Sequence, residues 1–333
     1  VPPSPKVMEW CTVESDPGIF TELVEKMGVK GLEFEELFSA DPSDLEAKSP
    51  IYGLIFLFKW DKDHAIDTQG NFDPDAPIFF AKQVISNACA TMAILSILMN
   101  HAEIDIGPHL SELKEFTGDF SPEMRGLAIG GSEVIRTAHN SFGRVDPFVF
   151  AESASSSSGA AYHFVSYVPI NGTVYELDGL QPAPKIVGTY PVESSWLQVA
   201  CPAIIQRMTA SASADIHFNL MAVTQSEEVA LAAAQESAAA MDDVQARNAL
   251  LHSIAERRAK WEEKKARWHR DSVWRSHNYI PFLSTFMRLA AEGNILKPHV
   301  EASKEACTSL EFPICSRSIF RSLPRFKSNN MTC

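Results

Sequence analysis

Residues 83–99 read QVISNACATMAILSILM, and the run from Met92 to Met99 is apolar on nearly every side. This pattern predicts a helix buried at the centre of a domain, because a surface helix carries only one apolar stripe. Cys89 stands near the start of the helix, where unpaired N–H groups and the helix dipole favour a thiolate. An unpaired cysteine in apolar surroundings is nevertheless more often core filling. A catalytic Cys89 therefore requires a base and an orienting group elsewhere.

Residues 162–180 read YHFVSYVPINGTVYELDGL and predict a β-hairpin. Two alternating runs flank the Asn-Gly pair at 171–172, which is a strong turn signal. We expect a strand at Tyr162–Val168 to return as a second strand at Val174–Gly179. The hairpin lies far from Cys89 in the sequence, so only the fold can bring the two together.

A turn centred on this pair places Val165 opposite Asp178. His163 shares the face of Val165, so His163 and Asp178 are expected to be diagonal neighbours. An imidazole that takes the sulfur proton and a carboxylate that orients it are what a nucleophilic Cys89 requires. Gln83 adds an amide donor for the oxyanion, and such a donor contributes about 3 kcal/mol. Each residue alone is weak support, but together they favour a cysteine hydrolase over core filling.

Composition and charge narrow the class of protein. With 333 residues, 45% hydrophobic content and 21% charge, the chain is typical of a globular protein. No apolar run approaches the ~18 residues of a membrane span, and no secretory signal is evident. The six cysteines lack the spacing of a zinc site or a disulfide scaffold, which fits a reducing compartment.

The charge is unevenly divided along the chain. Residues 1–225 hold 13 Lys and Arg against 29 Asp and Glu, whereas residues 226–333 hold 16 against 13. The acidic first part argues against nucleic acid as a partner and suits a basic one, although acidic surfaces also serve solubility alone.

Helical and strand patterns alternate in the first part of the chain and predict an α/β fold with a central sheet flanked by helices. Asp16-Pro17 starts a helix that Gly28 ends. The apolar run Ile51–Trp60 predicts a strand covered on both faces. Ser121-Pro122 starts a further helix that leads into residues 124–142. The irregular, serine-rich stretch Gly143–Ala161 is either a flexible insertion or a lid.

The patterns divide the chain into four parts. Residues 1–7 are expected to be disordered or a remnant of cloning, 8–225 a catalytic domain, 226–306 a helical extension for partner docking, and 307–333 a divergent, flexible tail. In the extension, Trp261 and Trp268 share one helix face with Leu250 and Ile254, so the helix buries that side.

Several of these segments resemble the ubiquitin carboxyl-terminal hydrolases, and in particular their long, proteasome-associated members. The similarity is carried by the segments QVISNACATMA (83–93), RGLAIGGSEVIR (125–136), HFVSYVPINGTVYELDGL (163–180), HFNLMAV (217–223) and HNYIPF (277–282). It implies a papain-like α/β fold with a knotted backbone, followed by an α-helical C-terminal extension.

The resemblance also implies a role for each site residue. Gln83 would line the oxyanion hole, Cys89 would attack, His163 would act as general base and then acid, and Asp178 would orient it, with no cofactor. The segment Gly143–Ala161 would be the crossover loop through which the tail of ubiquitin threads.

Further expectations concern binding partners. Phe218 is a weak candidate for a ubiquitin contact, because core packing is more common for such a residue. The segment 280–289 resembles an amphipathic docking helix with Ile280, Phe282 and Phe286 as anchors. The implied partners are a ubiquitin receptor of the proteasome regulatory particle and a chromatin-remodelling complex, which implies a cytoplasmic and nuclear location.

Two other functions remain open at this point. The first is a ubiquitin-binding proteasome adaptor whose catalytic site stays inactive until a partner binds. The second is a papain-type hydrolase that acts on ordinary peptides, which the crossover loop argues against because it excludes internal chain segments.

Overall fold

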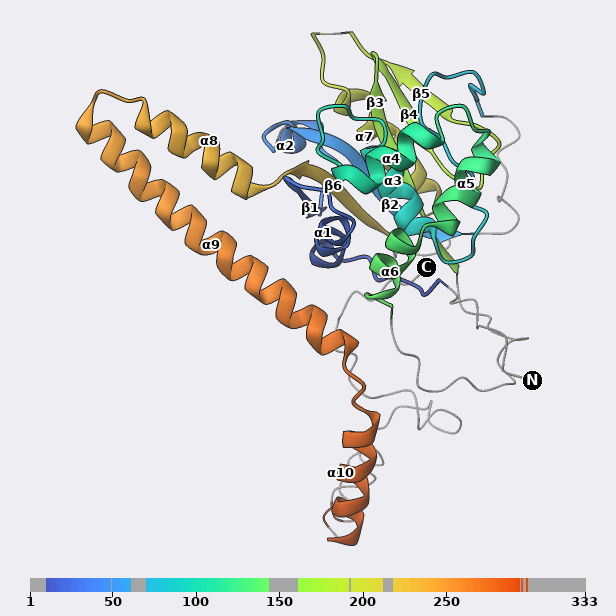
Figure 1. The fold of residues 1–333 in the computed structure, drawn as a ribbon, viewed down its shortest axis with the longest axis vertical. Helices are drawn as coiled ribbons and strands as arrows, with labels where there is room; N and C mark the ends of the chain where they lie inside the picture. The colour runs from blue at the N-terminus through green and yellow to red at the C-terminus, as the bar shows by residue number, and fades with distance from the viewer. Residues whose placement is uncertain are drawn as a thin grey trace, which may run out of the picture. The chain divides into compact units, whose positions relative to one another are not determined.

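The structure is a computed structural model (Figure 1) that describes residues 10–48, 50–60, 70–143, 161–191, 193–211, 218–293, 295 and 298. The described chain divides into two compact units: residues up to Arg275 belong to the first, and those from Ser276 onward to the second. The first unit contains the sheet and all the predicted catalytic residues.

A six-stranded sheet forms the centre of the first unit. Its strands are β1 (Leu32–Leu37), β2 (Ile51–Trp60), β3 (Ala161–Ile170), β4 (Thr173–Leu177), β5 (Lys185–Thr189) and β6 (Asn219–Gln225). They lie in the order β1-β6-β2-β3-β4-β5, and every neighbouring pair is antiparallel. In β2, Ile55 and Leu57 face one core while Leu54 and Phe56 face another. The prediction that Ile51–Trp60 is covered on both faces is therefore confirmed.

Helices cover both faces of this sheet. One core takes side chains from α1 (Pro17–Lys26), α3 (Cys89–Leu98), α4 (Gly107–Phe116), α5 (Pro122–Gly131) and α6 (Glu133–Asn140). The opposite core takes them from α2 (Pro42–Glu46) and α7 (Leu197–Ser211). All ten residues of α3 are buried, as its all-round apolar pattern predicts. The α/β fold with flanking helices is thus confirmed, while the knot stays a prediction.

The observed helix boundaries can be compared with the predicted cap and stop residues. Asp16 caps α1 by accepting from the Ile19 N–H at 3.1 Å, and Gly28 has a φ of +97°, as the cap and stop signals predict. The helix predicted from Ser121 is split in two, because the Ser132 hydroxyl accepts from the Ile135 N–H and caps α6. A second capping serine inside an apparently continuous pattern explains the difference.

The hairpin of β3 and β4 has the predicted register. Asn171 and Gly172 both have positive φ, 50° and 79°, which is the two-residue turn that matches strand twist. Val168 pairs with Tyr175 and Ser166 with Leu177 across the turn. The strand β4 ends at Leu177, two residues earlier than predicted, because the Asp178 carboxylate accepts from the Leu180 N–H and starts a turn there.

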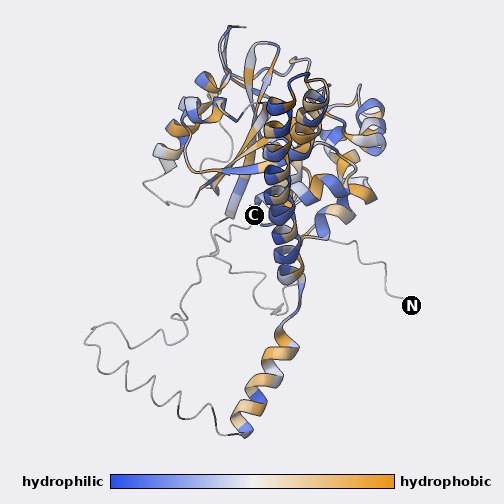
Figure 2. Ribbon diagram, turned by 90° about the vertical axis from the view of Figure 1, so that its left-hand side faces the viewer, coloured by the Kyte–Doolittle hydropathy of each residue, from blue (hydrophilic) through white to orange (hydrophobic). Residues whose placement is uncertain are grey.

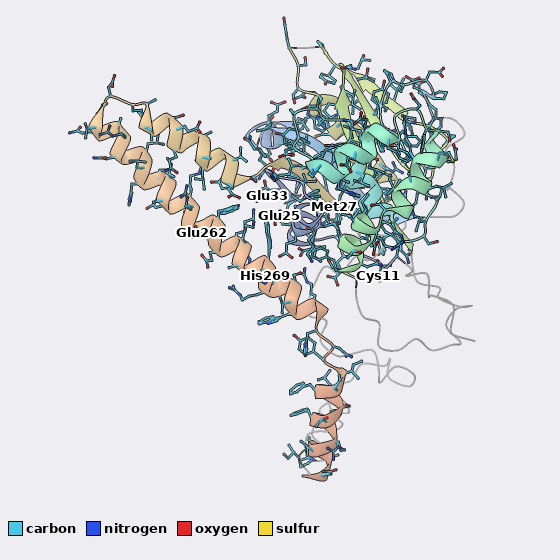
Figure 3. All side chains as sticks on the ribbon, viewed as in Figure 1. Cys11, Glu25, Met27, Glu33, Glu262 and His269 are labelled. Carbon is cyan, nitrogen blue, oxygen red and sulfur yellow. The ribbon has the colours of Figure 1, made fainter. Side chains whose placement is uncertain are left out.

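A helical pair follows the sheet in the same unit. The helices α8 (Glu227–Ala239) and α9 (Val244–Ser276) share a small core that contains Leu231, Ala238 and Ile254. The long helix α9 contacts α1 and β1, and Figure 3 marks Glu25 and Glu33 on this side of the domain. Trp261 and Trp268 point toward the domain, so the side of α9 that was predicted to be buried packs on the domain.

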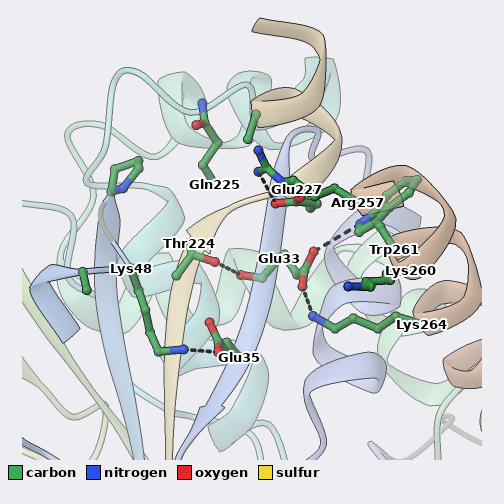
Figure 4. A pocket seen from close by; sticks show the side chains of 13 residues that line it. Glu33, Glu35, Lys48, Thr224, Gln225, Glu227, Arg257, Lys260, Trp261 and Lys264 are labelled. Carbon is green, nitrogen blue, oxygen red and sulfur yellow. Dashed lines mark hydrogen bonds and ion pairs between the residues drawn. The ribbon is translucent and has the colours of Figure 1, made fainter. Parts of the chain in front are cut away.

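A polar cavity of about 510 Å³ lies where α9 meets β1 and β6 (Figure 4). Glu33 accepts from Trp261 Nε1 and pairs with Lys264. The other acids of the cavity, Glu35 and Glu227, pair with a lysine and an arginine. Among its described lining residues there is no cysteine, serine or histidine.

The second unit is represented mainly by α10 (Ile280–Glu292). Figure 2 shows hydrophobic residues along most of this helix. Its exposed apolar side chains are Phe282, Leu283, Phe286, Met287 and Leu289. None of the helices among the described residues has the length and apolar character needed to cross a membrane.

Candidate active site

Cys89 is the first residue of α3. Its neighbour Ala88 occupies the cap position and provides no side-chain hydrogen bond to the helix. The chain enters the helix through Asn87, whose φ is +65°. Cys89 itself is buried, with 4% of its surface exposed. Because no cap side chain accepts from the first turn of α3, its N–H groups and the positive end of the helix favour negative charge beside Cys89.

His163 and Asp178 meet as the hairpin register predicts. His163 Nε2 lies 2.6 Å from Asp178 Oδ1, and both side chains are buried. The Asp178 carboxylate also accepts from the Leu180 N–H at 2.9 Å and from Gln181 Nε2 at 3.4 Å. Burial alone would raise the pKa of Asp178, but the bond to His163, the Leu180 N–H and the charge of Arg207 hold it below its usual value. Asp178 is therefore an anion with a fixed orientation.

The His163 ring joins Asp178 to Cys89. Its side chain is hydrogen-bonded to both residues. Since Nε2 is taken by Asp178, the other ring nitrogen, Nδ1, is left for Cys89. Burial alone would lower the pKa of His163, but the hydrogen bonds to Asp178 and Cys89 and the charges of both raise it to about 9. A protonated imidazole beside a cysteine stabilises the thiolate, which is the nucleophilic form.

Gln83 is attached to the same hairpin through its backbone. Its N–H donates to the Gly179 carbonyl at 2.9 Å, directly after Asp178. A Cβ at Gly179 would lie 2.8 Å from the Gln83 nitrogen, so only glycine permits this approach. Within the described part of the chain, the buried Gln83 Oε1 has no hydrogen-bond partner. The backbone of Gln83 is thus held beside the hairpin, while its half-buried side-chain amide has an oxygen that accepts no hydrogen bond from the described residues.

A buried polar cluster behind His163 is absent from the sequence predictions. Tyr167 OH donates to Glu176 Oε2 at 2.9 Å, and Arg207 Nη1 donates to Glu176 Oε1 at 2.6 Å. The Arg207 guanidinium lies 4.1 Å from the centre of the Phe58 ring, which meets the His163 ring edge-on at 6.0 Å. Tyr167 and Glu176 are direct cross-strand partners, so their polar pairing was readable from the register. Arg207 comes from α7, and no local signal connects it to the hairpin.

The other predicted site residues are not part of the catalytic group or lie outside the described residues. Phe218 directly precedes β6, is half-buried, and has its ring 6.4 Å from that of Phe56. Most of the predicted crossover loop, residues 144–160, lies outside the described residues. Ile280, Phe282 and Phe286 lie on α10 in the second unit. Among the residues with described positions, no group of His, Cys, Asp and Glu side chains has the arrangement of a metal site.

Comparison with known proteins identifies the family. A family model described as "Ubiquitin carboxyl-terminal hydrolase, family 1" matches residues 10–210, and one described as "Ubiquitin carboxyl-terminal hydrolases" matches residues 252–296. The chain is 38% identical to ubiquitin carboxyl-terminal hydrolase isozyme L5 of Dictyostelium discoideum, over 89% of this chain and 95% of that protein. It is 41% identical to ubiquitin carboxyl-terminal hydrolase 2 of Schizosaccharomyces pombe, over 87% and 93%.

A solved structure agrees with these matches. The crystal structure of Trichinella spiralis UCH37 bound to ubiquitin vinyl methyl ester has a TM-score of 0.63 and 39% sequence identity, covering 76% of this chain and 98% of that one. The sequence matches, the shared fold and the cysteine–histidine–aspartate geometry lead to one conclusion. The chain belongs to the ubiquitin carboxyl-terminal hydrolase family and is a cysteine peptidase of that family.

Proposed function

We propose that the chain cleaves the bond after the C-terminal glycine of ubiquitin through a thioester on Cys89. The Cys89 thiolate attacks the glycine carbonyl, and the His163 imidazolium gives its proton to the leaving amine or alcohol. His163 then takes a proton from water, whose oxygen attacks the thioester and releases ubiquitin and the thiolate. Asp178 keeps the imidazole oriented through both steps, and no metal or organic cofactor takes part.

The contact that carries this proposal is the His163 ring bonded to Asp178 on one side and to Cys89 on the other. The two partners come from segments far apart in the sequence and meet inside the core. Gln83, fixed to Gly179 by its backbone, is the proposed side-chain donor to the oxyanion. The N–H groups at the start of α3 complete the oxyanion site.

We infer that ubiquitin is the substrate because the family acts on it and because a relative was solved bound to ubiquitin vinyl methyl ester. The tail of ubiquitin carries leucine and arginine residues before its two terminal glycines. The acidic character of residues 1–225 suits such a basic tail. The half-buried Phe218 is the proposed apolar contact outside the site, and the segment Gly143–Ala161 is the proposed crossover loop.

The experiment that tests this function is release of a fluorescent amine from the C-terminus of ubiquitin. The intact chain, a form ending at Gln225, and Cys89→Ala are compared, with ubiquitin binding measured in parallel. Activity in the intact chain that disappears in Cys89→Ala supports the hydrolase. Ubiquitin binding without activity in either long or short form supports the adaptor instead, and activity only in the short form means that the extension inhibits.

We propose further that α10 docks on a ubiquitin receptor of the proteasome regulatory particle. Phe282 and Phe286 are 64% and 55% exposed, and their rings stack at 6.2 Å, so they present one continuous apolar surface. Exposed aromatic side chains on one helix face suit a groove on a partner. Ile280 begins the same helix. Association with a chromatin-remodelling complex and a cytoplasmic and nuclear location belong to the same proposal.

The docking proposal is tested with the full chain and the purified receptor. Replacing both Phe282 and Phe286 with alanine is expected to weaken binding at least about tenfold, since buried aromatic anchors dominate such interfaces. Trp274→Ala, which removes an exposed aromatic ring from α9, is the matched control and is expected to leave the Kd unchanged. An unchanged Kd in the double variant would contradict the proposal.

A further inference from the structure

Both flanks of the nucleophile are tied to other segments of the chain. Asn87 lies two residues before Cys89, and its Nδ2 donates to the Trp10 carbonyl at 3.1 Å. Thr91 lies two residues after Cys89, and its hydroxyl is 2.7 Å from His139 Nδ1. The start of α3 is thus held at one point before and one point after the reactive sulfur.

His139 connects Thr91 to the N-terminal segment. Its Nε2 lies 2.6 Å from the Cys11 carbonyl, which can only accept, so the ring proton is on Nε2. Nδ1 then accepts from the Thr91 hydroxyl. Burial lowers the pKa of His139, although the bond to Cys11 opposes this, and the ring is fully buried against Trp10. A neutral ring with a fixed tautomer therefore connects Thr91 to Cys11.

The N-terminal segment is held at a third point by α6. Asn140 Oδ1 accepts from the Cys11 N–H at 3.0 Å. Cys11, labelled in Figure 3, also lies so close to Gly143 that a Cβ there would be 2.3 Å from the Cys11 Cβ. Side chains therefore bind three backbone polar groups of residues 10–11. We call this set the N-terminal clamp, consisting of Trp10, Cys11, Asn87, Thr91, His139 and Asn140.

The backbone at Asn87 gives the clamp a consequence for Cys89. Asn87 has a φ of +65°, and among described residues other than glycine only Asn171 also has a positive φ. Such a conformation is strained for most side chains but tolerated by asparagine. It sets the direction in which the chain enters α3, and so the position of the Cys89 sulfur.

We propose that the N-terminal clamp positions Cys89 for reaction, with Asn87 and His139 as its two positioning residues. The proposal rests on Cys89 being the nucleophile. Neither residue touches the reacting atoms: each holds one flank of the helix start so that the sulfur faces the His163 ring. Loosening the clamp lowers the fraction of molecules with the sulfur and imidazole aligned, which reduces kcat and leaves ubiquitin binding intact.

The first test is Asn87→Asp in the full chain. Aspartate also tolerates positive φ, but its carboxylate cannot donate to the Trp10 carbonyl. Since Asn87 is exposed, the substitution opens no internal cavity. At a temperature where all variants are folded, kcat is expected to fall at least about tenfold with KM within about twofold. The pH dependence of the rate of Cys89 alkylation by iodoacetamide is expected to differ from that of wild type.

Asn171→Asp is the matched control, because Asn171 is the other asparagine with positive φ and lies in the hairpin turn. Aspartate is accepted in that turn, so kcat and the alkylation profile are expected to stay at wild-type values. Wild-type kcat in Asn87→Asp would overturn the proposal, and so would an equal loss in both variants.

The second test compares His139→Ala with His139→Gln. Glutamine supplies a donor for the Cys11 carbonyl and an acceptor for the Thr91 hydroxyl, so it is expected to restore much of the kcat that alanine loses. Equal kcat in the two variants would overturn the role of His139. If His139→Ala does not fold, the comparison of Asn87→Asp with Asn171→Asp alone tests the proposal. Full activity in Cys89→Ala would instead refute the proposed nucleophile, whatever the clamp variants do.

Discussion

The β3–β4 hairpin and the contact of α9 with α1 both depend on carboxylates paired with bases, but they differ in burial. In the hairpin, the His163 and Asp178 side chains are 5% and 3% exposed. Under α9, the Lys265 and Glu25 side chains are 34% and 43% exposed at 2.9 Å. Water screens the second pair and not the first, so similar distances carry different energies. Within the hairpin pair, Asp178 therefore helps to raise the pKa of His163 to about 9 and His163 helps to lower that of Asp178, whereas the α9 pairs mainly define how a helix lies.

The largest expected effect is that of Asp178→Asn. The amide keeps the size of the side chain but removes the negative charge that orients His163 and stabilises its protonated form. We therefore expect kcat to fall on the order of 10⁴-fold. Steady-state release of a fluorescent amine from ubiquitin measures this loss. Glu25→Gln is the matched change of an exposed acid in the α9 contact and is expected to leave kcat unchanged. A loss below tenfold in Asp178→Asn would remove the distinction between the two regions.

Gln83→Ala tests the oxyanion donor attached to the hairpin. Removal of one such donor is expected to lower kcat by about 10²- to 10³-fold, with little change in KM, because the bond forms only in the transition state. Gln198→Ala, at an exposed glutamine that donates to Glu46, is the control. A raised KM at unchanged kcat would show that Gln83 binds substrate and does not stabilise the oxyanion.

His163 and His139, which are both buried, are expected to respond to pH in opposite directions. The pKa of His163 is raised to about 9, so its protonation stabilises the fold fully below pH ~6.5, and this contribution disappears as the pH rises through about 9. The pKa of His139 is lowered, so its contribution is present above pH ~6.5 and decreases as the pH falls below it.

Chemical denaturation of wild type, His163→Gln and His139→Gln from pH 5 to pH 9 measures both contributions. The difference in unfolding free energy between wild type and His163→Gln is expected to shrink by on the order of 1–3 kcal/mol toward high pH. The difference for His139→Gln is expected to shrink toward low pH. The same slope in both variants would contradict the assigned protonation states.

The smallest effect is expected for the exposed pair of the α9 contact, which is compared with the buried acid of the same contact. Glu33 is its buried acid, bonded to Lys264 and Trp261, and Glu33→Gln is expected to lower the unfolding free energy by about 1–3 kcal/mol. Glu25→Gln, at an exposed pair, is expected to cost less than about 1 kcal/mol and to lose its effect in high salt. Thermal unfolding at low and high salt compares them, and equal costs would mean that burial does not rank these pairs.

Local patterns predicted the elements that contain the site. The Asn-Gly turn determines the register of the hairpin, so the placement of His163 beside Asp178 follows from counting residues. The all-round apolar run predicted the buried α3 with Cys89 at its start. These features depend on periodicities of a few residues, which a single sequence displays directly.

Long-range packing could not be predicted in the same way. That Cys89 reaches His163 depends on how α3 packs on the sheet, and no residue spacing encodes this. The bond of Arg207 to Glu176 and the bond of His139 to Cys11 join segments at least 30 residues apart. Residue chemistry and the family resemblance both predicted the catalytic roles, whereas these supporting bonds emerged only from the structure.

Covalent capture shows directly which side chain is the nucleophile. The full chain is reacted with ubiquitin carrying a C-terminal vinyl methyl ester, and the modified peptide is identified by mass spectrometry. We expect one adduct per chain, on Cys89, which forms more slowly in Asp178→Asn and is absent in Cys89→Ala. An adduct on another cysteine, or one that persists in Cys89→Ala, would contradict the assignment of Cys89 as the nucleophile.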